Sequence, residues 1–87
     1  MLGERIRAYL ARYGEEIDCD GAAHPAVFQP NLTEDGSSVA SWTAFLPFDA
    51  IVTVGSVLTS AIHLFTVADV VELRFRSDTV CLKAIVA

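Results

Sequence analysis

Residues 71–86, VELRFRSDTVCLKAIV, decide the fold class of this chain. In the first half of this stretch apolar and charged residues alternate, so an extended segment has one apolar and one charged face. Ser77-Asp78 has a turn-forming composition, and residues 79–86 return as a second strand. The stretch therefore predicts an antiparallel β-hairpin. Its apolar face consists of Val71, Leu73 and Phe75, and its charged face of Glu72, Arg74 and Arg76.

The same period of two predicts four more strands nearer the N-terminus, which cover residues 15–20, 26–28, 39–46 and 62–67. Asp20-Gly21 marks a turn after the first of them. Pro25 and Pro30 bracket the second, which favours strand ends or a sheet edge because proline cannot donate a ladder hydrogen bond. Pro47 ends the third, and the Gly55-Ser56 turn precedes the fourth. With the hairpin, about six strands are expected.

The N-terminal segment has helical periodicity instead. Its apolar residues fall on one stripe of an α-helix, with the arginines largely off it. Arg12 in the last turn and Gly14 beyond it supply a stop, with glycine expected in the left-handed conformation. The stripe consists of Leu2, Ile6, Tyr9, Leu10 and Tyr13.

A helix followed by about six strands predicts a mainly β (α+β) fold. We expect one domain over residues 1–87, in which the amphipathic helix packs on a small antiparallel β-barrel or twisted sheet. The 87 residues are 53% hydrophobic and only 20% charged, which is apolar for a free monomer of this size. Part of that apolar surplus is expected to serve a protein interface.

The charge distribution disfavours nucleic acid as a direct ligand. The net charge is −5, and residues 15–50 contain no lysine or arginine at all. Phosphate neutralisation needs clustered basic residues, and the three arginines of the N-terminal helix are typical of an ordinary solvated face. The acidic middle of the chain is better suited to steer toward a basic protein surface.

No membrane span is expected. Residues 50–68 carry no charge, but they contain Gly55, His63 and several Ser and Thr residues, and their β-branched content suits strands. The start MLGERIRAYL has charges where a signal peptide needs its apolar stretch, so the chain is expected to be cytoplasmic at synthesis.

Cys19 and Cys81 form neither a CxxC motif nor a zinc ligand set, and we expect buried free thiols. A disulfide between them stays open as an alternative.

No catalytic, cofactor or metal site is predicted. His24 lies beside a proline in an expected turn and His63 in an expected strand, and neither has a catalytic motif around it. The acidic cluster from Glu15 to Asp20 lacks the looped, glycine-containing spacing of a calcium site. All five glycines are isolated, so no phosphate-binding loop is present in the sequence.

The candidate functional residues belong to an interface. Residues 31–38, NLTEDGSS, form a polar, acidic loop and are expected to be the most mobile segment. Three aromatic residues lie close together in sequence around Pro47, and buried aromatics commonly anchor interfaces, although a core position is favoured for the tryptophan. The candidate interface residues are Asn31, Glu34, Asp35, Trp42 and Phe48.

Four pieces of the chain resemble the small head–tail connector, or head-completion, proteins of tailed bacteriophages and prophages. Two are the helix end Arg12-Tyr13-Gly14-Glu15 and the segment Ala26-Val27-Phe28-Gln29-Pro30. The others are the turn at 54–59, VGSVLT, and Phe65-Thr66-Val67 with the hairpin that follows. The family often has a glycine–aromatic pair where this chain has Ser60-Ala61, and residues 31–38 have no counterpart in it.

The resemblance implies a virion structural protein that forms a ring beneath the portal of a DNA-filled head. It implies portal, adaptor or tail proteins and further copies of the chain as partners, no catalytic residues and no cofactor, and a location in the virion after assembly. In that role Glu34 and Asp35 are expected to repel DNA phosphate from the channel. Two alternatives stay open: a protein-binding barrel of non-phage origin, and a small ligand-binding or catalytic barrel with a pocket around His63 or Trp42.

Overall fold

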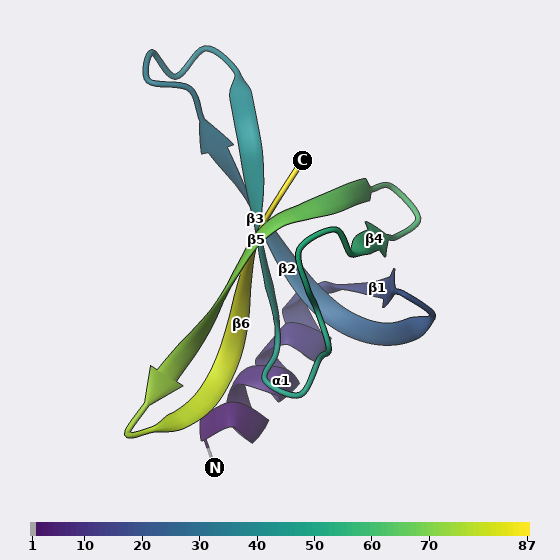
Figure 1. Ribbon diagram of the computed structural model, residues 1–87, viewed down its shortest axis with the longest axis vertical. Coiled ribbons are helices and arrows are strands. Elements are labelled where there is room, and N and C mark those ends of the chain that lie inside the picture. The colour runs from purple at the N-terminus through teal and green to yellow at the C-terminus, as the bar shows by residue number, and fades with distance from the viewer. Residues whose placement is uncertain (1) are drawn as a thin grey trace.

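One helix and six antiparallel strands follow one another in a computed structural model that describes residues 2–87 (Figure 1). The mainly β fold expected from the sequence is confirmed. No helix among the described residues is long and apolar enough to cross a membrane. The elements are α1 (Leu2–Tyr13), β1 (Glu15–Cys19), β2 (Ala22–Leu32), β3 (Val39–Pro47), β4 (Val57–Thr59), β5 (Leu64–Phe75) and β6 (Asp78–Val86).

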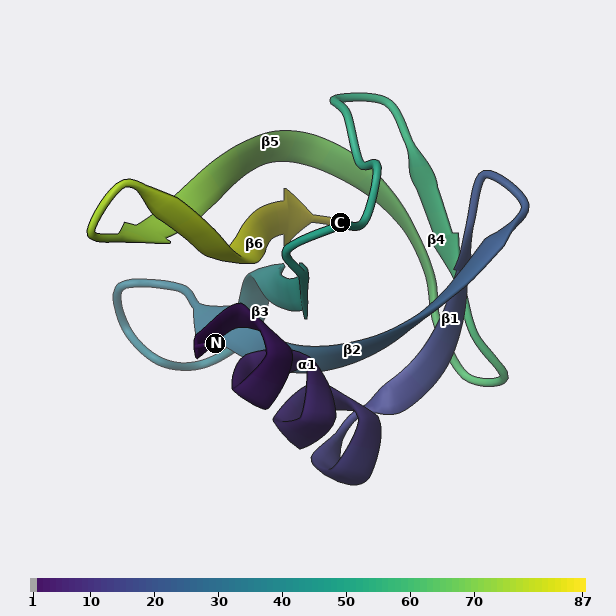
Figure 2. The ribbon, with the colours of Figure 1, turned by 90° about the horizontal axis from the view of Figure 1, so that it is seen from below.

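The strands close into a barrel in the order β1-β2-β3-β6-β5-β4. Closure depends on the short pairing of β1 with β4, in which Asp18 opposes Thr59 and Cys19 opposes Leu58. Figure 2 shows the ring of strands from below, with α1 outside it. Of the two architectures expected, the chain therefore forms the barrel.

Strand β2 belongs to both halves of the barrel, and the prediction for its prolines needs correction. Residues 22–26 pair with β1, and residues 27–32 pair with β3 on the other edge. Pro25 and Pro30 therefore lie inside an 11-residue strand, not at its ends. Each proline nevertheless sits in a half that is paired on one edge only, so neither interrupts a doubly paired ladder.

Strand β5 is likewise shared between the two halves. Residues 62–67 and 71–76 were expected as separate strands, but one 12-residue strand runs from Leu64 to Phe75. Its first residues pair with β4 and the rest with β6, with a register shift between Val67 and Asp69. The total of six strands is nevertheless unchanged. The two predicted strands merge into one, but the structure adds β4, a short strand after the Gly55-Ser56 turn that was not predicted.

The core fills the barrel. Its members come from all six strands and from the β3–β4 connection, and Leu46, Leu58 and Val86 are completely buried. Cys19 belongs to this core, whereas Cys81 lies beneath α1 on the outer side of the sheet, and both are free. Burial raises the pKa of both thiols above its usual range.

Helix α1 packs across the outside of the barrel through only part of its apolar stripe. Leu10 is buried and Ile6 half-buried, while Leu2, Tyr9 and Tyr13 stay exposed. Gly3 lies against the ring of Phe48. The guanidinium of Arg7 donates two hydrogen bonds, of 2.6 and 2.8 Å, to the carboxylate of Asp49 in the β3–β4 connection.

Gly14 ends the helix for a reason other than the expected one. Its φ is not positive; the positive-φ glycines are Gly21, Gly36 and Gly55. A Cβ at Gly14 would lie 2.3 Å from the carbonyl oxygen of Ala26, so glycine is required by the close approach of the chain to β2. This contact fixes where β1 begins.

The two tight hairpins are closed by residues with positive φ. Asp20 and Gly21, with φ of 52° and 93°, form the predicted β1–β2 turn. The β5–β6 turn is Arg76-Ser77, with φ of 52° and 73°, and not Ser77-Asp78, because Asp78 already pairs with Phe75. Positive φ at both central positions gives the twist that a two-residue hairpin favours.

Candidate functional site

A cavity of about 330 Å³ opens between the C-terminal end of α1, strands β2 and β3, and the β4–β5 loop. This volume lies at the lower end of the ~300–1,000 Å³ that ligand pockets occupy. It brings together Trp42 and His63, the two residues around which the sequence suggested a pocket. The lining residues are Tyr13, Gly14, Glu15, Ala26, Val27, Phe28, Trp42 and His63.

Aromatic rings gather around His63. The imidazole stacks on Phe65 with 4.9 Å between the ring centroids and 23° between the planes. Phe28 and Trp42 contact it at tilted angles, with centroids 4.9 and 5.7 Å away. Phe65 is buried, whereas Phe28, Trp42 and His63 are half-buried and line the cavity. The cavity therefore has an aromatic wall supported from beneath.

The imidazole of His63 also forms a hydrogen bond with a carboxylate. Its Nδ1 lies 2.5 Å from Oε1 of Glu15, and the side chains are 22% and 29% exposed. In the neutral imidazole Nδ1 donates this hydrogen bond, which leaves Nε2 as an acceptor. One ring nitrogen of His63 is thus satisfied, and the residue lies in the β4–β5 loop and not within the expected strand.

The β4–β5 loop holds His63 in place through Ser60. The backbone N–H of His63 donates to Oγ of Ser60 at 3.0 Å, and the N–H of Ser60 donates to the carbonyl of His63 at 2.9 Å. The hydroxyl of Ser60 also lies 3.4 Å from Oε1 of Glu15. The position of the imidazole is therefore set by the fold without a ligand.

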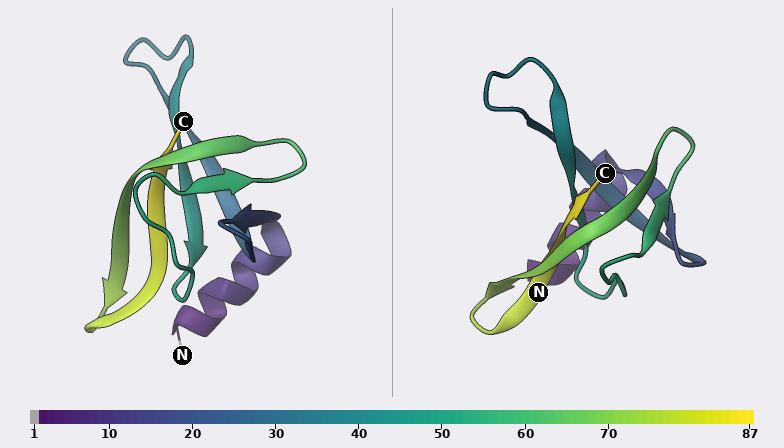
Figure 3. Two further views of the ribbon diagram at one scale, coloured as in Figure 1. Left: turned by 45° about the vertical axis from the view of Figure 1, so that its right-hand side comes forward. Right: turned by 45° about the horizontal axis from the view of Figure 1, so that its top comes forward.

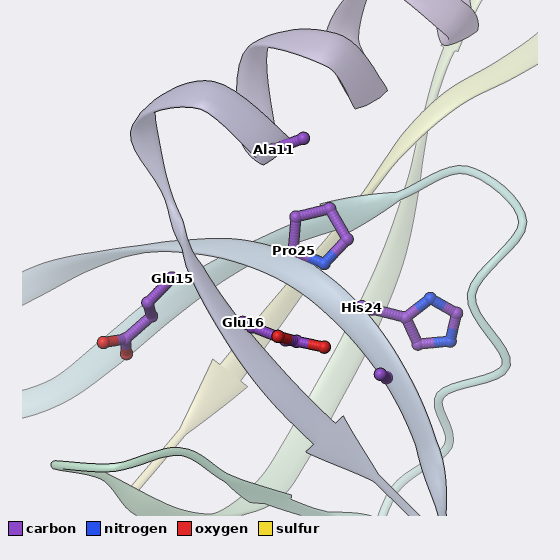
Figure 4. Close-up of a pocket in the computed structure, with 6 residues that line it drawn as sticks. Ala11, Glu15, Glu16, His24 and Pro25 are labelled. Atoms are coloured by element: carbon purple, nitrogen blue, oxygen red, sulfur yellow. The ribbon is translucent and has the colours of Figure 1, made fainter.

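A neighbouring pocket of about 250 Å³ lies on the other side of β1 (Figure 4). Glu16 and His24 line it, and Figure 4 shows the carboxylate of Glu15 turned away from them. His24, expected in a turn, is a half-buried residue of β2 opposite Ile17. Among residues 2–87, no three His, Cys, Asp or Glu side chains are placed to hold a metal ion together.

The predicted acidic loop forms the tip of the β2–β3 hairpin, which projects from the barrel (Figure 3). Asn31 is not part of the loop, because it lies in β2 and its amide exchanges hydrogen bonds with the hydroxyl of Thr43. Glu34 is exposed. Asp35 accepts hydrogen bonds from the hydroxyl of Thr33 and from Ser37, which lower its pKa to about 2.

The aromatic candidates around Pro47 do not form one cluster. Trp42 packs against the imidazole of His63 and against Phe65 of the core. Phe45 faces the opposite side of β3 and lines an apolar groove under α1. Phe48 packs against Gly3 of the helix. The five candidate interface residues are therefore distributed over four separate places: Asn31 in β2, Glu34 and Asp35 at the hairpin tip, Trp42 at the cavity and Phe48 beside the helix.

The apolar groove under α1 has a volume of about 370 Å³. It continues onto the outer face of the β5–β6 hairpin, where Val71, Leu73 and Phe75 stay exposed. The lining residues are Ile6, Tyr9, Leu10, Val27, Phe45, Leu73, Val80 and Cys81. The sequence predicted the apolar face of the hairpin but no groove between that face and the helix.

Glu15 was considered only as a possible calcium ligand, and its pairing with His63 was missed. The two residues are 48 positions apart and share no motif. The one sequence signal was His63, an ionisable residue within the otherwise uncharged stretch of residues 50–68. Comparisons with protein-family models, curated proteins and solved structures find no match for this chain.

Proposed function

We propose that this protein is a structural subunit that associates head-to-tail into a ring at the head–tail junction of a tailed phage or prophage. The ring joins or closes the portal end of the head. The observation that carries the proposal is a pair of separate apolar patches at the two ends of strand β5. A compact domain has no internal use for either patch.

The first patch is the outer face of the β5–β6 hairpin. Val71, Leu73 and Phe75 lie on alternate positions of β5 and are exposed, with Phe75 at 53%. The second patch is the outer face of the β4–β5 hairpin. Leu64 is 72% exposed and Ile62, in the loop before it, 76% exposed. Val57 belongs to the same face as Leu64, because Leu58 and Phe65 between them point into the core.

The two patches belong to the two ends of β5, and Figure 1 shows that these ends lie far apart, on opposite sides of the ribbon. Two different patches that meet in neighbouring copies form a heterologous contact. Such a contact repeats from copy to copy and closes into a ring when the rotation permits. The acidic hairpin tip with Glu34 and Asp35 projects away from both patches and is free to face a channel or the next ring.

A protein-binding barrel of non-phage origin is the second candidate. The apolar groove under α1 favours it, because a groove of about 370 Å³ suits a few apolar side chains of a partner segment. The two candidates differ in self-assembly. An adaptor of this kind stays monomeric or dimeric, whereas a connector subunit forms a closed ring alone or on its partner.

Complementation between two patch variants tests the ring. Leu64→Glu and Phe75→Glu each place a charge in one patch and leave the core unchanged. We expect wild-type protein to form a closed oligomer in sedimentation, each variant to be monomeric, and their equimolar mixture to give dimers through the one intact contact. Ile51→Glu, at an 83% exposed position outside both patches, is the control and should leave the oligomer intact.

A capture experiment identifies the place of the ring. Tagged protein is incubated with lysate of its source cells after prophage induction, and bound proteins are identified by mass spectrometry. Portal, adaptor or tail proteins in the eluate support the proposal and name the side of the junction. A wild-type protein that stays monomeric in sedimentation and captures only cellular enzymes or signalling proteins would overturn it and favour the adaptor.

A further inference from the structure

We propose that the cavity formed by Tyr13, Glu15, Phe28, Trp42 and His63 binds the cationic side chain of a basic residue, a guanidinium or ammonium group, presented by a protein chain. This inference goes beyond the ring, because a monomer can have such a site. It depends on the acceptors, the aromatic wall and the charge of the cavity.

The polar groups that line the cavity are set up to accept hydrogen bonds. Nδ1 of His63 is bonded to Oε1 of Glu15, and a neutral imidazole bonded in this way presents the lone pair of Nε2. Oε2 of Glu15 has no hydrogen-bond partner within residues 2–87. A ligand that only donates hydrogen bonds fits this set. Guanidinium and ammonium groups are donors without acceptors.

The aromatic wall favours the same class of ligand. Phe28, Trp42 and Tyr13 line one cavity together with the imidazole of His63. The faces of such rings carry negative potential and attract cations, tryptophan most strongly and arginine most often. The aliphatic stem of a long basic side chain can lie against the same rings. An anionic ligand would meet both the carboxylate and these ring faces.

The charge around the cavity also selects a cation. Glu15, Glu16 and Asp18 lie in β1 and Asp20 follows in the β1–β2 turn, and residues 15–50 contain no lysine or arginine. Arg12, the nearest basic residue in the sequence, lies over the ring of Tyr13 at 5.4 Å. One ring at the cavity thus already accepts a guanidinium, while Glu15 has no lysine or arginine partner among residues 2–87.

A titration with a small guanidinium compound tests the site. Trp42 is the only tryptophan, so its fluorescence reports on the cavity directly. The probe is Nα-acetyl-arginine amide, and its neutral counterpart is Nα-acetyl-citrulline amide, which has nearly the same shape. We expect saturable binding of the arginine compound with a Kd on the order of 1 mM to 10 mM, and at least ~10-fold weaker binding of the citrulline compound.

Two variants with the same loss of charge separate the site from general attraction to an acidic protein. Glu15→Gln should weaken binding of arginine amide about 10-fold, because it removes the carboxylate in the cavity. Glu16→Gln removes the neighbouring carboxylate, which faces the other pocket, and should change the Kd less than about 2-fold (Figure 4). Equal binding of the two compounds to the wild-type protein, or equal effects of the two variants, would overturn the proposal.

The basic residue can come from a second copy of this chain or from another protein. Arg76 at the exposed tip of the β5–β6 hairpin is the candidate within the chain, and it stacks on Phe75 of the first apolar patch at 5.3 Å. If Arg76→Gln and Glu15→Gln weaken self-association in sedimentation to the same extent, a second copy supplies the cation. If only binding of arginine amide depends on Glu15, another protein supplies it. Failure of the ring leaves the fluorescence titration as an independent result.

Discussion

Replacing Gly14 by alanine should destabilise the protein more than any other glycine substitution in the described chain. The added Cβ would lie 2.3 Å from the carbonyl oxygen of Ala26 and 2.6 Å from that of Leu10. Both are backbone atoms of regular elements, α1 and β2, so neither can move away by a change of rotamer as a side-chain atom can. Relief requires the end of α1 to move away from β2.

The expected cost follows from two opposing contributions. Overpacking against fixed atoms costs about 3 kcal/mol, at the upper end of the usual range. Alanine restricts the unfolded chain more than glycine and returns about 1 kcal/mol. The net loss is about 2 kcal/mol. For a domain of this size it lowers the Tm by roughly 8–16 °C.

Urea and thermal unfolding, followed by Trp42 fluorescence and far-ultraviolet circular dichroism, measure this loss. Gly36→Ala is the control for conformation, because φ is +72° there and the space around it is open; it should cost about 1 kcal/mol. Gly3→Ala is the control for the helix. Its Cβ would meet only the ring of Phe48 at 3.0 Å, and alanine favours helix by up to about 1 kcal/mol, so we expect little net change.

A loss of Tm in Gly14→Ala no larger than that in Gly36→Ala would contradict this prediction. That result would mean that α1 and β2 can separate at little cost. It would also mean that the position of Glu15, the next residue, is not fixed by the close approach at Gly14. Chemical shifts of the Trp42 indole in the variant would then report whether the cavity keeps its shape.

Three further outcomes are expected. The carboxyl of Asp35 should titrate in a carbon-detected NMR experiment with a pKa of about 2, so its hydrogen bonds order the loop fully above its ordinary value of 3.8 and are lost as the pH falls through about 2. Because burial raises the pKa of Cys19 and Cys81, both thiols should react with a disulfide reagent slowly in the native protein and rapidly in urea; fast labelling of the native protein would contradict this. Asp49→Asn should cost only about 0.5 kcal/mol in urea unfolding, because the ion pair with Arg7 is exposed, and a loss above about 1.5 kcal/mol would show that it matters more.

Local pattern predicted the elements whose contacts are local. The helix 2–13, the β1–β2 turn and the β5–β6 hairpin follow from periodicity and turn chemistry within a few residues of each other. The continuity of β5 could not be predicted in this way. At its bulge, two residues oppose one of β6 between Val67 and Asp69, which reverses the side-chain alternation. Val67 and Val70 therefore both face the core, and a strict period of two stops between them.

The cavity was beyond local pattern for a different reason. Glu15 begins β1 and His63 precedes β5, and the two meet only because β1 pairs with β4 and closes the barrel. The pairing of β1 with β4 involves only two residues of each strand, which is too short to be predicted from the sequence. Trp42 and His63 could be selected from the sequence by residue type. Glu15 could not, because nothing in the sequence shows that its carboxylate meets His63.

The continuity of β5 has a mechanical consequence for an assembly built on its two ends. Neighbours that pull on Leu64 and on Phe75 load a single covalent strand along its length. The tension then passes along the peptide bonds of β5. The hydrogen bonds of β5 to β4 and β6 do not have to transmit it from one neighbour to the next. A hoop of such subunits would resist expansion from within as a chain of linked strands does.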